Sequence, residues 1–177
     1  MLWILVLMSL NAMAAPFPGT HLQPAFAQKP GFFLSSKGFE INSAQTAWIQ
    51  IAPPKHIPSL VTVYRAPVRT GSQQPALTVR VDDLKKPLAL TTYVKHWMKD
   101  YPRFGFDVLT AKPIKVGTNP AFLLDLVSHE TQKQLRQVVF VRNKTAVILT
   151  CRDARESFSK TVHDCNQIMK TFEWLNQ

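Results

Sequence analysis

Hydrophobic residues in the last third of the chain form three short runs, and a helical stripe follows them. The runs are residues 121–127 (AFLLDLV), 134–141 (QLRQVVFV) and 145–151 (TAVILTC), and their lengths are typical of strands. Residues 147–149 (VIL) are apolar on both sides of the pleat, whereas a strand with one wet face alternates. We therefore expect a sheet that is covered on both faces.

The first predicted helix spans about residues 92–101. Thr91 or Thr92 can cap its start, and Pro102 ends it because proline disfavours helical angles in the preceding residue. Its apolar residues have the spacing of one buried stripe, namely Leu90, Val94, Trp97, Met98 and Tyr101. The opposite face is strongly basic, and it carries Lys95, His96 and Lys99, with Arg103 just beyond.

The second predicted helix closes the chain at about residues 155–175. Asp153 and Glu156 have the spacing of a capping box at its start. Its apolar stripe consists of Phe158, Val162, Cys165, Ile168, Phe172 and Leu175. Cys165 therefore faces the sheet, and Cys151 ends the last strand, so a disulfide between them is expected. The alternative is two buried free thiols.

The first half of the chain is rich in β structure. Residues 37–42 and 46–51 alternate and suggest a first hairpin, and residues 60–64 and 76–81 are further strands. Residues 107–116 form one more strand, in which Pro113 indicates an edge position or a bulge. The whole pattern predicts the α+β class, with an antiparallel sheet sandwiched by helices.

The N-terminus has the pattern of a cleaved export signal. Residues 2–10 are apolar apart from Ser9 and precede Ala12-Met13-Ala14-Ala15, a small-x-small site, so residues 1–15 are the expected signal. The run is far shorter than the roughly 20 residues of a membrane-spanning helix. Cleavage could lie as late as residue 27, because Ala25-Phe26-Ala27 repeats the pattern. A buried N-terminal element of a cytosolic protein is the alternative, since no Lys or Arg precedes the apolar run.

Behind the signal, residues 16–31 are an irregular leader and residues 32–177 are one domain of ordinary size. The chain has 21 Lys and Arg against 11 Asp and Glu, which gives a net charge of +10. Such a surplus favours anionic partners through long-range attraction. A soluble basic protein without a polyanionic partner is the alternative.

The sequence contains no catalytic motif that we can identify and no pattern for a cofactor. His96 and Asp100 lie one helical turn apart, but two ligands make a weak metal site, so no metal is expected. His129-Glu130 and His163-Asp164 are expected at the surface. Export, and the absence of aromatic residues among the basic positions, count against nucleic-acid binding.

Several local patterns together resemble the PsbP-like superfamily over roughly residues 32–175. They are the Tyr93 and Trp97 spacing before Tyr101-Pro102, the hairpin segment 136–141, the strand end 149–151 and the terminal segment 171–174 (TFEW). The resemblance implies an α/β/α sandwich, and it implies a non-enzymatic accessory or binding protein. The resemblance assigns no functional role to any individual residue of this chain.

Two functional hypotheses follow. The first is an exported, non-enzymatic accessory protein, periplasmic or secreted, without a transmembrane segment after signal cleavage. It would engage a protein or an anionic envelope partner through Lys95, His96, Lys99 and Arg103. The second is a small secreted hydrolase whose site assembles from scattered His, Asp and Ser residues. The absence of a local nucleophile motif favours the first.

Overall fold

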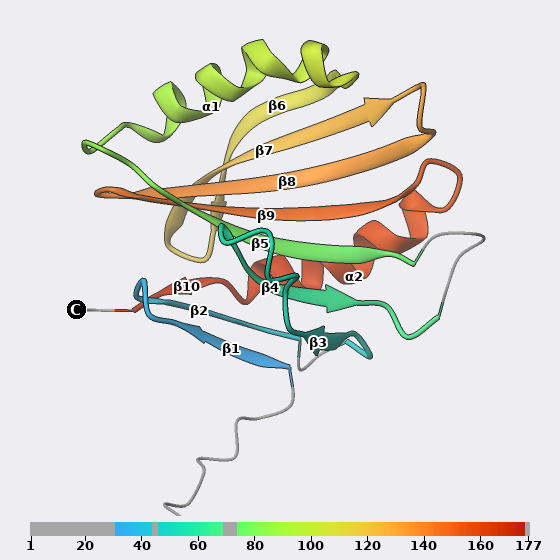
Figure 1. The fold of residues 1–177 in the computed structure, drawn as a ribbon, viewed down its shortest axis with the longest axis horizontal. Helices are drawn as coiled ribbons and strands as arrows, with labels where there is room; N and C mark the ends of the chain where they lie inside the picture. The colour runs from blue at the N-terminus through green and yellow to red at the C-terminus, as the bar shows by residue number, and fades with distance from the viewer. Residues whose placement is uncertain (1–30, 44–45, 69–73, 176–177) are drawn as a thin grey trace, which may run out of the picture.

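The computed structural model describes residues 31–43, 46–68 and 74–175. The predicted signal and, apart from Gly31, the predicted leader lie outside the described residues. Seven strands of the described chain form one antiparallel sheet in the order β3-β4-β5-β9-β8-β7-β6 (Figure 1). Its strands are β3 (Ile49–Ile51), β4 (Leu60–Arg65), β5 (Ala76–Asp83), β6 (Asp107–Val116), β7 (Asn119–Ser128), β8 (Lys133–Arg142) and β9 (Thr145–Ala154).

Two layers cover this sheet, one on each face (Figure 1). Helix α1 (Leu90–Asp100) covers one face, and it continues into the 3-10 turn η1 (Tyr101–Phe104). The other face packs against α2 (Phe158–Lys170) and against a small sheet in the order β1-β2-β10. The small sheet consists of β1 (Phe32–Ser35), β2 (Phe39–Asn42) and β10 (Glu173–Trp174).

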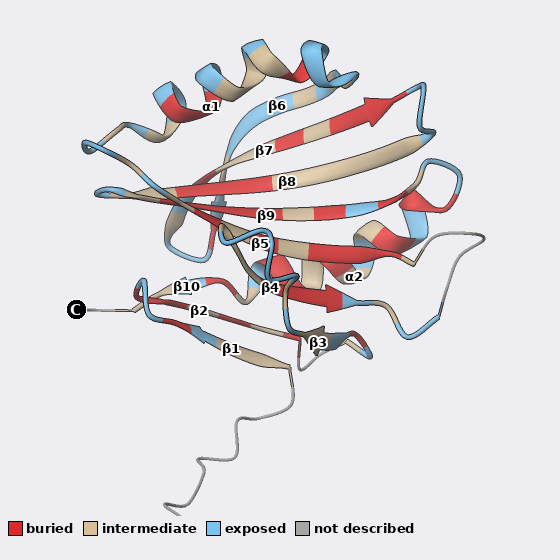
Figure 2. Cartoon of the chain, in the orientation of Figure 1, coloured by how far each residue is buried: buried red, intermediate tan, exposed pale blue. Residues whose placement is uncertain are grey.

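Strand β9 contributes side chains to both cores of the molecule. Val147 and Leu149 pack on the α2 side, whereas Ala146 and Ile148 pack on the α1 side. All four side chains are at most 3% exposed, and much of β9 is coloured as buried in Figure 2. The prediction of a sheet covered on both faces is therefore confirmed. The α+β class and the sandwich arrangement are confirmed as well.

The predicted hairpin between residues 37–42 and 46–51 is wrong. Strand β2 pairs with β1 and β10 in the small sheet, and β3 pairs with β4 in the large one. The reason is burial. Phe39 is fully buried and its ring lies 5.5 Å from that of Phe172, whereas Ile49 is 59% exposed. The aromatic contact therefore favours a position of β2 beside the C-terminal strand β10 and not beside β3.

The second helix is shorter than predicted, because α2 ends at Lys170 and the chain then forms β10. Phe172 leaves the helical stripe and stacks on Phe140, with ring centroids 3.8 Å apart. Thr171 caps the helix end, and its Oγ1 accepts a hydrogen bond from the Asn42 N–H at 2.9 Å. Stacking and strand pairing therefore replace the last turn of the predicted helix.

The predicted caps are also wrong. Helix α1 has Ala89 at its N-cap and no side-chain cap, so neither Thr91 nor Thr92 serves. Asp153 lies inside β9 and is only 2% exposed. It accepts a hydrogen bond from the Ser157 hydroxyl at 2.8 Å and another from Thr161. The carboxylate thus reaches the first turn of α2 from the sheet, and it does not form a capping box.

Strand β6 is an edge strand, as Pro113 predicted. The register shifts between Val108 and Thr110, so the irregularity lies three to five residues before Pro113 and not at the proline itself. At Pro113 the strand still pairs with Phe122. An edge position tolerates proline because one side of the strand needs no hydrogen-bond donor.

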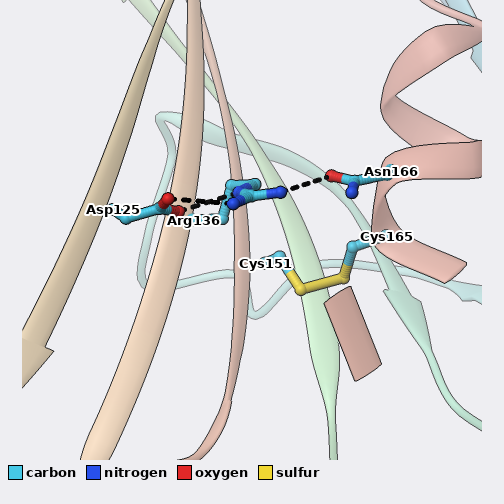
Figure 3. Close-up of polar contacts among 5 residues, drawn as sticks. All are labelled: Asp125, Arg136, Cys151, Cys165 and Asn166. Carbon is cyan, nitrogen blue, oxygen red and sulfur yellow. Dashed lines mark hydrogen bonds and ion pairs between the residues drawn. A yellow bond between two sulfur atoms is a disulfide. The ribbon is translucent and has the colours of Figure 1, made fainter. Parts of the chain in front are cut away.

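Cys151 and Cys165 form a disulfide that joins β9 to α2 (Figure 3). Both residues are fully buried. The bridge closes a loop with a sequence separation of 14. Closing a loop of that length stabilises a fold by about 3 kcal/mol in the chain-entropy model. The position of α2 on the sheet is therefore fixed by a covalent bond as well as by packing.

Candidate functional site

The four residues predicted from sequence as a binding face lie together on the outside of α1 and η1. Lys95, His96, Lys99 and Arg103 are all exposed, whereas Tyr93 and Val94 point into the core. We call these four residues the basic α1 surface. Asp100 approaches Arg103 at 3.8 Å, but the Arg103 side chain is 81% exposed. Its guanidinium therefore remains accessible to a partner.

The charge around the basic α1 surface is predominantly positive. In residues 84–106, five cationic side chains stand against one carboxylate, which leaves a net charge of +4. The cations are Lys85, Lys86, Lys95, Lys99 and Arg103, all exposed, and the carboxylate is Asp100. Exposed like charges within about 8 Å of one another reinforce a common potential at physiological salt. The surface can therefore attract anions without a dedicated binding pocket.

Hydrogen bonds and a cation–π contact hold α1 and η1 on the sheet. The Tyr93 hydroxyl donates to Asp82 of β5, and the Tyr101 hydroxyl donates to Gln137 of β8 at 2.6 Å. The Arg80 guanidinium lies 4.6 Å from the centroid of the Trp97 ring, a cation–π contact. These contacts reach two strands, β5 and β8, so the basic α1 surface is held on a fixed base.

Arg80 is paired with Asp82, but the pairing is incomplete. Its Nη2 donates to Oδ2 of Asp82 at 3.2 Å. Its Nε lies 3.1 Å from Oδ1, yet the geometry is not that of a hydrogen bond, and the atom is buried. The stacking on Trp97 therefore contributes to holding the guanidinium at this position.

Burial changes the acidity of the tyrosines. Burial raises the pKa of Tyr101 to about 12, and the Arg80 charge lowers it slightly. Burial raises the pKa of Tyr93 further, and the hydrogen bond to Asp82 adds to this effect. Burial also raises the pKa of Tyr64, whose hydroxyl donates to the Ile41 carbonyl at 3.1 Å. All three phenols are therefore neutral donors at physiological pH.

A second candidate site lies on the opposite face of the sheet. It is a cleft of about 490 Å³ between the C-terminal half of α2 and strands β6 to β8, and we call it the α2 cleft. Its apolar lining is entirely aliphatic and consists of Ile114, Val116, Leu123, Val138 and Met169. Its cationic lining consists of Lys115, Arg136 and Lys170.

An ion pair holds Arg136 in this cleft (Figure 3). Its Nε and Nη2 donate to the two oxygens of Asp125, each at 2.8 Å. Its Nη1 donates to Oδ1 of Asn166 on α2 at 3.2 Å. The pair is largely buried, with 22% and 13% of the two side chains exposed. Arg136 therefore connects β7, β8 and α2 at the wall of the cleft.

Sequence reasoning missed the α2 cleft, although one signal for it was present. Asp125 and Arg136 lie in two successive predicted strands, and they face each other in the register of β7 and β8. Opposite charges at facing positions inside otherwise apolar strands suggest a buried pair. The cleft itself depends on how α2 packs against β6 to β8, and no local pattern specifies that packing.

A further groove lies beside the proline-rich loop after β3. It has a volume of about 420 Å³ and is lined by Pro53, Pro54 and Ile57, with Arg65 and Arg152 among the remaining residues. Both arginines are exposed. The groove therefore presents two cationic side chains to solvent.

The histidines do not assemble a metal site in the described part of the chain. No group of three or more His, Cys, Asp or Glu side chains suited to a metal occurs there. His96 and Asp100 have no third ligand beside them. His129 lies 3.3 Å from Asp107, and both side chains are more than half exposed.

No family model and no curated protein matches this sequence. Comparison with solved structures shows that the chain has the PsbP-like fold. The solution structure of cyanobacterial PsbP (CyanoP) from Synechocystis aligns with a TM-score of 0.58 and 12% identity over 85% of this chain and 95% of that one. No helix in the described ranges is long and apolar enough to cross a membrane.

Two further solved structures share this fold. PA94 from Pseudomonas aeruginosa, a protein of unknown function, aligns with a TM-score of 0.59 and 16% identity over 82% of this chain and 97% of that one. LpqN from Mycobacterium tuberculosis, which is involved in cell envelope biogenesis, gives 0.58 and 11% over 73% and 79% of the two chains. At these identities the comparisons establish the fold alone.

The buried phenols predict how stability depends on pH. The three tyrosines of the chain are Tyr64, Tyr93 and Tyr101, and each has a raised pKa in the folded state. The unfolded chain ionises its phenols at about pH 10. The free energy of unfolding should therefore fall as pH rises above about 10, because only the unfolded state releases these protons.

Tyrosinate absorbance measures this directly. At about pH 10.5, urea-unfolded protein should be more than half ionised, whereas folded protein should show little tyrosinate. Identical titration midpoints for the folded and unfolded protein would show that the phenols are not held as described.

Proposed function

We propose that the mature chain is an exported, non-enzymatic accessory protein that binds an anionic partner of the cell envelope through the basic α1 surface. The observation that carries the proposal is the net charge of +4 in residues 84–106, with four exposed basic side chains on α1 and η1. Such a surface raises the local concentration of anions and steers them toward the protein. A fixed helix presents these charges without an entropic cost for ordering a loop.

The anchoring of α1 supports a binding role. Tyr93, Trp97 and Tyr101 use their polar or aromatic faces to bind the sheet, and the basic residues are not needed for that contact. Lys95 and Lys99 make no side-chain contact with the sheet that the structure records. Their charge is therefore free to act on a partner.

The hydrolase alternative has weaker support. Across the described ranges, no serine or threonine hydroxyl is hydrogen-bonded to a histidine. Ser157 and Thr161 both donate to the buried Asp153, where they help to fix the start of α2. A nucleophile needs a base within hydrogen-bond reach. We therefore favour the binding role.

Export is part of the proposal, and two observations support it. The apolar run of residues 2–10 ends in a small-x-small site. A buried disulfide joins Cys151 and Cys165, and disulfides persist in oxidising compartments and are rare in the cytosol. The protein would act in the periplasm or outside the cell.

Charge reversal tests the basic α1 surface. The triple variant Lys95→Glu, Lys99→Glu and Arg103→Glu should fold normally, because exposed substitutions usually change stability by about 0.5 kcal/mol or less each. Its binding to vesicles of equimolar phosphatidylcholine and phosphatidylglycerol should fall by at least about tenfold, since the attraction is electrostatic. Wild-type binding should weaken as salt rises.

The matched control reverses three exposed lysines elsewhere, with Lys55→Glu, Lys144→Glu and Lys160→Glu. It changes the net charge by the same amount and should retain most of the binding. Equal losses in both triple variants would mean that total charge matters and not this surface. Unchanged binding in the first variant would move the anionic contact elsewhere, first to the groove beside Pro53.

Export predicts the state of the native protein. Protein recovered from the envelope or culture fluid of its host should lack the signal, with the cut after a residue between 15 and 27. Cys151 and Cys165 should resist a maleimide after unfolding without reductant and react once reduced. Intact mass and labelling measure both properties. A cytosolic product that begins at Met1 and has two free thiols would contradict the proposal.

A further inference from the structure

The α2 cleft is separate from the basic α1 surface, because α1 and α2 lie on opposite faces of the seven-stranded sheet (Figure 1). Its volume of about 490 Å³ falls within the range of about 300–1,000 Å³ that is typical of small-molecule sites. Nothing in the proposed function depends on this cleft. We propose that it binds a small amphipathic anion, specifically a fatty acid carboxylate.

The lining favours an alkyl chain. All five apolar residues that form the cleft are aliphatic, and no aromatic side chain lines it. Val116 and Val138 are almost buried, at 7% and 3% exposure, whereas Ile114 and Leu123 are half-buried and can still lose solvent on binding. An alkyl chain gains free energy with each methylene that leaves water, and an aliphatic lining offers no ring on which an aromatic ligand could stack.

The charges favour an anionic head group. Three cations line the cleft and no carboxylate is among its lining residues. Asp125 neutralises Arg136, but Lys115 and Lys170 are exposed and have no acidic partner that the structure records. The cleft thus carries two uncompensated ammonium groups beside an aliphatic wall. A carboxylate on an alkyl chain matches both features.

Arg136 prepares the site in two ways. A guanidinium has five N–H donors, and three of them bind Asp125 and Asn166. The other two have no acceptor that the structure records among the described residues, and Arg136 lines the cleft. The bond to Asn166 also links β8 to α2 across the wall of the cleft (Figure 3). The α2 cleft is therefore part of the packed structure, because Arg136 joins β8 to α2 at its wall.

Assigned backbone amide spectra of the folded protein test the proposal with decanoate below its micelle concentration. Decanoate should shift the amides of residues 114–117, Leu123 and residues 169–170 in a saturable manner, and it should leave α1 unchanged. Decyltrimethylammonium has the same chain with the opposite charge, and it should bind at least about tenfold more weakly, because the head group then meets like charges. Absence of decanoate shifts in the cleft, or equal binding of the two probes, would overturn the assignment.

Two variants separate the head group from the chain. Lys115→Glu with Lys170→Glu should lower decanoate affinity by about tenfold, because two exposed attractions become repulsions. Leu123→Glu should abolish binding by placing a carboxylate in the aliphatic wall. If the Leu123 variant does not fold, the lysine variant still decides the matter, since both of its positions are exposed.

The control for the lysine variant is Lys144→Glu with Lys160→Glu, which changes the net charge equally outside the cleft. It should bind decanoate as the wild type does. Retained affinity in the Lys115 and Lys170 variant would overturn the proposal. Vesicle binding through the basic α1 surface is measured separately, so either proposal can fail while the other stands.

Discussion

Two-sided burial of the central strands is the constraint on which the rest of this structure depends. Strand β9 places Val147 and Leu149 in one core and Ala146 and Ile148 in the other, all nearly or completely buried. A strand that is apolar on both faces needs a layer on each side. Helix α1 supplies one layer, and α2 with the small sheet supplies the other. The two candidate binding sites are therefore on opposite faces and share only the sheet.

Each helix is held on this sheet by a few hydrogen bonds between polar side chains that are partly or fully buried. The Asp82 carboxylate accepts a hydrogen bond from the Tyr93 hydroxyl of α1. The Asp153 carboxylate accepts one from the Ser157 hydroxyl at the start of α2. Arg136 joins β8 to α2 farther along the helix. A buried polar group costs free energy unless it is paired, so these contacts favour one placement of each helix. This placement keeps the basic side chains of α1 in solvent and the α2 cleft open.

The sequence predicts well those features that depend on local periodicity. The strands around residues 121–151 and the helix with Trp97 and Met98 on its stripe follow from spacing alone, and so does the exposure of Lys95. The pairing of β2 with β10 could not be predicted, because it is a long-range contact decided by Phe39 and Phe172. The α2 cleft was missed for a related reason, since it lies between α2 and strands β6 to β8 and depends on long-range packing.

Native-state amide hydrogen exchange tests the central role of the two-sided strands. If they hold both layers, the amides of Val147 and Leu149 should exchange only through global unfolding, with a protection free energy equal to the free energy of unfolding. The amides of β3, a three-residue edge strand, should exchange through local opening. Equal protection of β3 and β9, or exchange of β9 well below the global free energy, would contradict the account.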